Sequence, residues 1–344
     1  MRNNATGSGN SAFGRGALYL NAAGSFNSAF GNLALESNTA GYNSALGARA
    51  LRANTSGHSN TAVGFEALTS NTTGYRNAAL GRSALRANTT GFYNTAIGQN
   101  ALVQNTTGGG NTSVGQDSMT SNTSGSSNTA VGVEALVSNA GGISNTGVGV
   151  STLANNTNGS NNVALGVLAG FNQTTGNNNI YLVNQGAAGE SGRIKIGVVG
   201  THTQTTIAGI SGATSAGGIA VLVNASGVLG TTTSSARFKE DVRDMGDASD
   251  VLMRLRPVTF RYREDAVGAE ESQTTQYGLI AEEVAEVAPE LVAQDLDGKP
   301  YSVKYHELPA LLLNQVQEQE QEIASLKAQM AQLQRQLAES SAAR

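Results

Sequence analysis

A pair of serines followed by a lysine lies where the composition of the chain changes abruptly. The segment SSARFKEDV, residues 234–242, follows a long stretch that is rich in Gly, Asn and Thr and nearly free of charge. A serine hydroxyl becomes a nucleophile when a base takes its proton, and a lysine amine can be that base if burial lowers its pKa from about 10.4 to roughly 7–8. The spacing of Ser234 and Lys239 requires a bend in the backbone if the two are to meet. On spacing alone, an exposed pair without a catalytic role is the better interpretation.

Other residue types that carry chemistry are sparse. The chain has no cysteine, which excludes disulfides and thiolate metal sites, and its three histidines are far apart in the sequence. Residues 1–185 contain only dispersed acidic residues, without the paired carboxylates of a glycosidase. We therefore expect neither a metal ion nor a cofactor.

Charge is unevenly divided along the 344 residues. Residues 1–233 hold 9 Lys and Arg against 5 Asp and Glu, a net charge of +4, whereas residues 234–344 hold 12 against 20, a net charge of −8. Neither part gathers its basic residues into a stripe, so we expect no nucleic-acid partner. The first residues lack an apolar segment, and no apolar run approaches about 18 residues. We expect no signal peptide in the sequence and no membrane span.

The first half of the chain is an internal repeat. Motifs such as NSALG, NTAVG and NTAIG recur between residues 10 and 179 at a spacing of 17 residues, shortened once to 16 between Asn27 and Asn43. A glycine follows four residues after each Asn, an Ala-Leu pair after seven and eight, and a second Asn after eleven. Each unit therefore combines a short strand, a turn at glycine, a small apolar plug and an Asn-Thr-Thr-Gly type of turn.

Such a unit is too short to bury an apolar face alone, but stacked copies can do so. Stacking places identical residues about 4.8 Å apart, and it allows both Asn columns to form side-chain amide ladders. We therefore predict that residues 10–185 form a β-solenoid shaft, roughly 50 Å long, after a lead at residues 1–9.

Aromatic residues recur at one variable position of the repeat, and we expect them to stack in a column. They are Tyr42, His58, Tyr75 and Phe92. A ladder that stabilises the solenoid is the simpler interpretation. A contact strip for a receptor or a glycan is the alternative.

The pattern changes twice after the shaft. Residues 186–233 are predicted to be a β-rich connector, because AVLV, the turn NASG and a return strand indicate a hairpin. Residues 234–311 are typical of a small α+β domain, in which DASDVLMRL predicts an N-capped helix and PVTFRYR a half-buried strand. YGLIAEEVAEV predicts a helix ended by Pro289, and DLDGKPYSVKY predicts a turn that leads into a strand.

A heptad pattern follows over residues 312–344. One position carries Val316, Ile323, Met330 and Leu337, and the other carries Leu312, Leu326 and Leu333. Glu322 and Lys327 fall where an interchain ion pair can form. We therefore predict a coiled coil, which needs partner helices.

The repeats resemble the head repeats of trimeric autotransporter adhesins, whose units also run Asn, Ser or Thr, small residue, aliphatic residue, Gly. This resemblance implies a trimer of left-handed β-rolls. The blocks SSARFKEDV, LRPVTFRY, GLIAEEV, PELV and SVKYHELPALLLNQV stand in this order before the coil. They resemble the C-terminal intramolecular chaperone domain of phage tail spikes and tail fibres, of the endosialidase type, over about 234–320.

The second resemblance implies a self-cleaving serine peptidase. In that family the domain trimerises, guides the folding of the preceding β-structure and then releases itself at its own first serine. Carried over to this chain, the resemblance makes Ser234 the nucleophile, Lys239 the base and Thr233–Ser234 the scissile bond, used in a single turnover. Ser235 stands where the family often has Asp, which makes it a minor rival. His306 lies beside a predicted strand end and is left outside the dyad.

The favoured function is a homotrimeric, tail-fibre-like shaft that binds a host-surface glycan or receptor, with a folding chaperone that removes itself. The expected location is a phage virion tail or a bacterial cell surface. A bacterial surface adhesin with the same chaperone module and a structural spacer without a ligand remain the alternatives. The expected fold is mostly β: a solenoid, then an α+β domain and a coiled coil.

Overall fold

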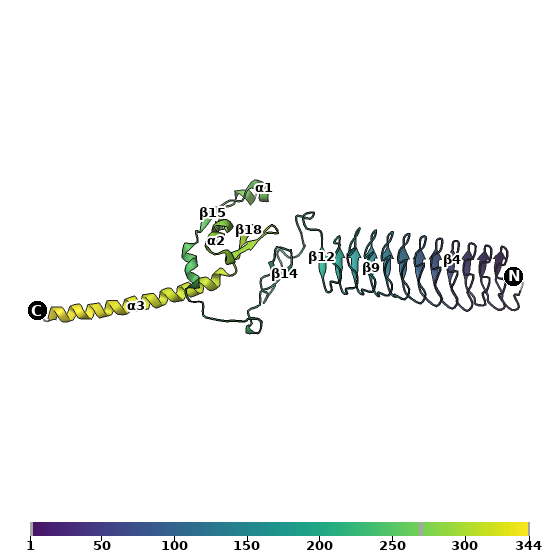
Figure 1. Ribbon diagram of the computed structural model, residues 1–344, viewed down its shortest axis with the longest axis horizontal. Helices are drawn as coiled ribbons and strands as arrows, with labels where there is room; N and C mark the ends of the chain where they lie inside the picture. Colours follow the sequence, from purple (N-terminus) through teal and green to yellow (C-terminus); the bar gives the residue numbers. More distant parts are fainter. Residues whose placement is uncertain (1–2, 268–270, 343–344) are drawn as a thin grey trace. The chain divides into compact units, whose positions relative to one another are not determined.

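The computed structural model describes residues 3–267 and 271–342. The chain divides into two compact units, Met1–Ala208 and Gly209–Arg344. The first unit contains the repeats, and Figure 1 shows their rungs stacked in sequence order. The predicted class is confirmed: a mostly β chain, with a solenoid of 17-residue spacing followed by small α+β elements and a C-terminal helix.

The described part of the first unit is built on one parallel sheet of 12 strands in sequence order. Each rung contributes one three-residue strand, and successive strands pair in register, as Ala62 does with Ala79. The strands are β1 (Ser11–Phe13), β2 (Ser28–Phe30), β3 (Ser44–Leu46), β4 (Thr61–Val63), β5 (Ala78–Leu80), β6 (Thr95–Ile97), β7 (Thr112–Val114), β8 (Thr129–Val131), β9 (Thr146–Val148), β10 (Val163–Leu165), β11 (Ile180–Leu182) and β12 (Ile194–Ile196).

The glycine that follows each of the strands β1 to β10 is a steric requirement. Gly64, Gly81 and Gly98 have φ angles of 135°, 140° and 131°, and they stack in register. A Cβ atom on Gly64 would collide with the carbonyl oxygen of Gly81, and one on Gly81 with that of Gly98. Only a residue without a side chain fits where these glycines stack; the column ends after β10, since Val183 follows β11.

The core of the shaft is a column of Ala beside a column of Leu. The middle residue of each strand from β2 to β11, such as Ala79, points inward and is buried. Leu68, Leu85 and Leu102 are fully buried although their φ angles are positive, at 52–53°. A β-branched residue is strained at such an angle, which explains why this apolar column contains Leu and Met but neither Val nor Ile.

Two columns of Asn are buried along the shaft, as predicted. In the turn column, Asn71 Nδ2 donates to Asn54 Oδ1 at 2.7 Å and to the carbonyl oxygen of Gly74 at 2.9 Å. In the strand column, Asn60 Oδ1 accepts a hydrogen bond from the backbone N–H of Asn77 at 3.0 Å. Each rung thus satisfies the buried polar groups of the next.

The aromatic residues form two stacks, so the prediction of a single column is wrong at Tyr42. Tyr42 stacks on Phe26, with ring centroids 5.4 Å apart, whereas His58, Tyr75 and Phe92 form a second stack at 5.2 and 5.3 Å. The single 16-residue spacing is the reason. It places Tyr42 directly before the Asn that starts its strand, while the other three stand one position earlier.

The ladder formed by the turn column of Asn ends where three positions of the repeat carry a different residue type. Gln173 replaces the ladder Asn, Gly170 replaces the buried Leu, and Tyr181 replaces the inward Ala. The buried Tyr181 ring occupies the space that a side chain at Gly170 would need, since a Cβ there would lie 2.9 Å from the ring. Gln173 donates to the carbonyl oxygen of Glu190 at 3.3 Å instead of continuing the ladder, so Asn156 Oδ1 is left without a partner.

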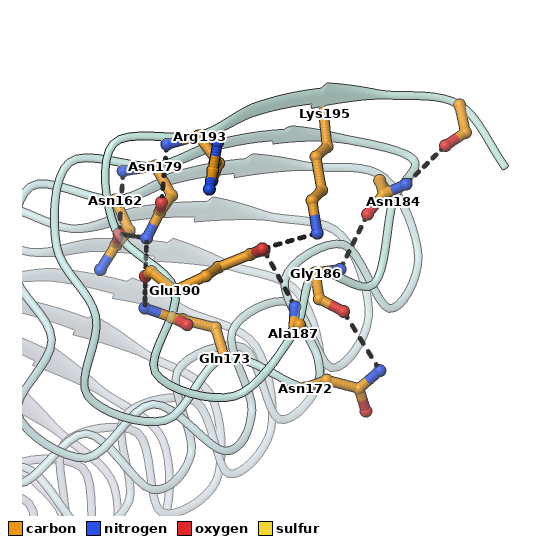
Figure 2. Close-up of polar contacts among 11 residues, drawn as sticks. Asn162, Asn172, Gln173, Asn179, Asn184, Gly186, Ala187, Glu190, Arg193 and Lys195 are labelled. Atoms are coloured by element: carbon orange, nitrogen blue, oxygen red, sulfur yellow. Dashed lines mark hydrogen bonds and ion pairs between the residues drawn. The ribbon is translucent and has the colours of Figure 1, made fainter. Parts of the chain in front are cut away.

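Glu190 closes this end of the solenoid, as Figure 2 shows. Its carboxylate accepts the backbone N–H of Ala187 at 2.9 Å and pairs with Lys195 Nζ at 2.6 Å. Burial opposes the charge, but these hydrogen bonds hold the pKa of Glu190 below its usual value. Burial, and then the nearby Glu190 carboxylate, raise the pKa of Tyr181 well above its ordinary range.

The second unit is made of short elements around a small core. Buried in this core are Val284, Ala288, Leu291, Val292 and Val303. The elements are β13 (Leu222–Val223), β14 (Leu229–Gly230), η1 (Ala236–Phe238), η2 (Gly246–Arg254), β15 (Val258–Phe260), α1 (Glu264–Val267), η3 (Glu271–Gln273), β16 (Gln276–Gly278), α2 (Ala281–Val287), η4 (Pro289–Leu291), β17 (Val292–Gln294), β18 (Pro300–Val303) and α3 (Leu308–Ala342), where η denotes a 3₁₀ helix.

Most predicted elements of this unit are present. The hairpin β13–β14 forms, strand β15 pairs with β16, and helix α2 ends before Pro289. The segment DASDVLMRL differs from its prediction, because it forms the 3₁₀ helix η2 without a side-chain cap. Val251 and Leu255 still pack against the small core.

Candidate functional site

The segment around Ser234 turns once before the α+β elements begin. Thr233 and Ser234 lie outside any helix or strand, and Ser235 precedes η1 with φ −65° and ψ 135°. Lys239 ends η1, and its backbone N–H donates to the carbonyl oxygen of Ala236 at 3.0 Å. The bend expected between Ser234 and Lys239 is therefore present.

The side chains of the two residues are not joined in the single chain. Thr233, Ser234, Ser235 and Lys239 are all exposed. Among the described residues, Ser234 Oγ and Lys239 Nζ have neither a hydrogen bond nor an ion pair. A lysine amine becomes neutral through burial, and this chain by itself does not bury Lys239.

A groove of about 1340 Å³ lies within the second unit, between the hairpins β13–β14 and β17–β18. Its lining includes Thr231 and Thr232, which directly precede Thr233, together with His306 and Glu307. His306 Nε2 is 3.7 Å from Glu307 Oε1. The sequence pattern gave no signal for this neighbourhood, because the two segments are more than seventy positions apart.

Polar contacts hold the surrounding elements together. Asn314 of α3 donates to the carbonyl oxygen of Gly246 at 2.9 Å and to Ser249 Oγ at 2.8 Å, which fixes the start of α3 against η2. Arg256 pairs with Glu283 of α2, and its guanidinium lowers the pKa of that carboxyl. The backbone N–H of Leu279 donates to Tyr305 Oη at 2.9 Å. These contacts support the region that follows the proposed cleavage site.

Two stripes of apolar side chains are exposed outside this region. On the shaft, the last strand residue of every rung is apolar and at least partly exposed. These residues are Phe13, Phe30, Leu46, Val63, Leu80, Ile97, Val114, Val131, Val148, Leu165, Leu182 and Ile196. On α3, the exposed apolar residues are Leu312, Leu313, Val316, Ile323, Leu326, Met330, Leu333 and Leu337.

Other kinds of site are not found in the described parts of the chain. Residues 3–267 and 271–342 contain no cluster of His, Asp and Glu that could hold a metal ion. Within the same ranges, no helix is both long and apolar enough to cross a membrane.

Comparison with known protein families gave a match in the C-terminal region. Neither the curated proteins nor the solved structures gave a match. Among protein families, one match begins at Ser234 and ends at residue 293, inside the region where the resemblance was predicted, and it leaves the repeats outside. The family that this chain matches, over residues 234–293, is Peptidase_S74, the chaperone of endosialidase.

Proposed function

We propose that the chain is the subunit of a homotrimeric, tail-fibre-like shaft whose C-terminal domain guides assembly and then cuts itself off between Thr233 and Ser234. The observation that carries this proposal is the start of the family match at Ser234, where the composition also changes and η1 bends the backbone. In this proposal residues 10–185 are the receptor-binding shaft, 186–233 the connector, 234–311 the chaperone peptidase and 312–344 the coiled coil.

The proposed reaction proceeds through an ester. Lys239, as a neutral amine, takes the hydroxyl proton of Ser234, and Ser234 Oγ attacks the carbonyl carbon of Thr233. The peptide C–N bond breaks as the proton passes to the Ser234 amine, and an ester joins Thr233 to Ser234 Oγ. Water then hydrolyses the ester, which leaves a carboxylate on Thr233 and restores the Ser234 hydroxyl. No cofactor is consumed.

The exposed stripe on the shaft supports assembly from copies of this chain. An apolar residue recurs at the same place on every rung, so only a partner with the same rung spacing can contact all of them in register. A stripe of this length supplies on the order of 1,000 Å² per subunit, which is the size of a specific interface. We therefore assign the stripe to contact with two further copies.

Helix α3 supports the same assembly. Its heptad residues Val316, Ile323, Met330 and Leu337 are between 45% and 67% exposed. Such a seam is buried when parallel helices associate. Assembly also offers a route to bury Lys239, which is exposed in the single chain, and so couples cleavage to correct association.

The test is intact-mass analysis of purified Ser234→Ala and Lys239→Ala variants, with Ser235→Ala as the matched control. We expect both dyad variants to remain full-length trimers, because the nucleophile or the base is gone while the folding function stays. Ser235→Ala should be cleaved as the wild type is. Cleavage of Ser234→Ala at the wild-type rate would overturn the proposed mechanism, and loss of cleavage only in Ser235→Ala would move the nucleophile to the rival serine.

A further inference from the structure

The second aromatic stack of the shaft belongs to a larger exposed cluster. Tyr93 lies edge-on to Tyr75 and to Phe92, with ring centroids 5.5 and 5.6 Å apart. The Arg76 guanidinium lies 5.3 Å from the centre of the Tyr93 ring and donates to Tyr93 Oη. We call His58, Tyr75, Arg76, Phe92 and Tyr93 the aromatic cluster. It spans three consecutive rungs, and Phe92 and Tyr93 are 40% and 47% exposed.

The fold does not need aromatic rings at these positions. In four other rungs the residue equivalent to Phe92 is Ser25, Ser126, Ser160 or Asn177, and its side-chain oxygen accepts the backbone N–H of the preceding rung. Ser126 Oγ accepts that of Gly109 at 3.1 Å, and Ser160 Oγ accepts that of Ile143 at 3.1 Å. An aromatic ring offers no such acceptor. The cluster therefore gives up hydrogen bonds that the solenoid makes elsewhere and gains exposed apolar surface instead.

A row of free hydroxyl groups accompanies the cluster. In each turn the first Thr is committed to the ladder, as Thr72 Oγ1 donates to the carbonyl oxygen of Thr89 at 3.1 Å. The second Thr of each turn, at Thr73, Thr90 and Thr107, is exposed, and among the described residues its hydroxyl has no hydrogen-bond partner. The turns thus present apolar rings beside regularly spaced hydroxyl groups.

We infer that the aromatic cluster is a binding site for a carbohydrate chain. A sugar ring has an apolar C–H face that suits aromatic side chains and a rim of hydroxyl groups that suits Thr, Tyr and Arg as hydrogen-bond partners. The turns 54–59, 71–76, 88–93 and 105–110 contain no acidic residue that would repel a glycan. Tyr and Arg are also the residue types that contribute most at binding surfaces. The inference rests on the proposed receptor-binding function and gives it a site.

The test is binding of the trimeric protein to an array of bacterial surface polysaccharides. Phe92→Ser and Tyr93→Ser each install the residue that other rungs carry at the same position, so the shaft should fold as before. Tyr42→Ser, in the first stack, is the matched control because Ser59 occupies the same column. We expect the wild type and Tyr42→Ser to bind the same glycans and the two cluster variants to bind at least about tenfold more weakly, with unchanged thermal unfolding and sedimentation.

Four outcomes would overturn the inference. Binding of no glycan by the wild type, or equal binding by all variants, would remove the cluster from recognition. A lower unfolding temperature in Phe92→Ser would make the stack a structural ladder, and a change in sedimentation would make it a subunit contact. Self-cleavage of the same preparations is measured separately, so failure here is distinguishable from failure of the proposed function.

Discussion

The shaft and the C-terminal unit solve the problem of burial in different ways. In the shaft, each rung covers the next, and both Asn columns are satisfied by neighbouring rungs of the same chain. In the C-terminal unit the core is small, and the heptad residues of α3 are exposed. Neighbouring repeats cover one another within one chain, whereas nothing in the described part of the single chain covers the heptad residues of α3. This difference is the reason that our proposal assigns folding help and cleavage to the C-terminal unit.

The largest effect should come from removing the C-terminal unit. A chain that ends at Thr233 should accumulate as aggregate, because a long parallel sheet forms slowly and exposes its apolar stripe while it does so. The shaft released by cleavage of the wild type is the control and should stay soluble. Solubility and sedimentation distinguish the two. A soluble trimeric shaft made without residues 234–344 would remove the need for a chaperone.

A charge in the shaft stripe should break assembly without disturbing the rung. Ile97→Asp places a carboxylate where two further copies are proposed to pack, and burying an unpaired charge costs several kcal/mol. Gln99→Asp, exposed on the same rung, is the matched control. Analytical ultracentrifugation should give a monomer for Ile97→Asp and a trimer for Gln99→Asp. Trimers from both variants would place the interface elsewhere.

The middle and the end of the ladder of turn Asn residues should differ in sensitivity. Asn71→Ala removes the three buried hydrogen bonds that Asn71 makes with Asn54, Gly74 and Asn88, and we expect a loss of about 3 kcal/mol. Asn156→Ala should cost about 1 kcal/mol less, because Asn156 Oδ1 already lacks a donor. Thermal unfolding of the two variants at one scan rate measures the difference. Equal losses would mean that the end of the ladder is as well satisfied as its middle.

The smallest effect should be a pH dependence at the end of the solenoid. The pKa of Glu190 is lowered in the folded chain, so its contribution is present above the unfolded value of about 4.3 and is lost as pH falls through the lower folded value. Glu190→Gln should lower stability slightly at neutral pH, where the ionised carboxylate contributes, and should flatten the unfolding profile below about pH 4.3, where that contribution is otherwise lost. If the variant lost stability in acid as steeply as the wild type does, Glu190 would not be the source of this pH dependence.

Much of the shaft could be predicted because every structural requirement recurs. Gly81 and Asn71 stand in columns whose spacing reveals what the backbone needs at each offset. The shift of Tyr42 into another column followed from one missing residue, and the sequence already contained that signal. The sequence showed the replacement of Leu by Gly170 and of Ala by Tyr181 only as a break in the pattern. Its reason is three-dimensional, because the Tyr181 ring fills the space beside Gly170.

The candidate site could be predicted only in part. The spacing of Ser234 and Lys239 indicated a bend, and η1 provides it. The burial of Lys239 depends on packing that a local segment does not encode, so the single chain leaves the residue exposed. The neighbourhood of His306 was missed for a similar reason, because it arises from two hairpins far apart in the sequence.

The most direct test of the central claim is the mass of the wild-type protein under denaturing conditions after purification as a trimer. The account predicts two fragments, residues 1–233 and residues 234–344, the second with Ser234 as its first residue. An intact chain in a stable trimer would contradict self-cleavage and leave residues 234–344 with a chaperone role alone.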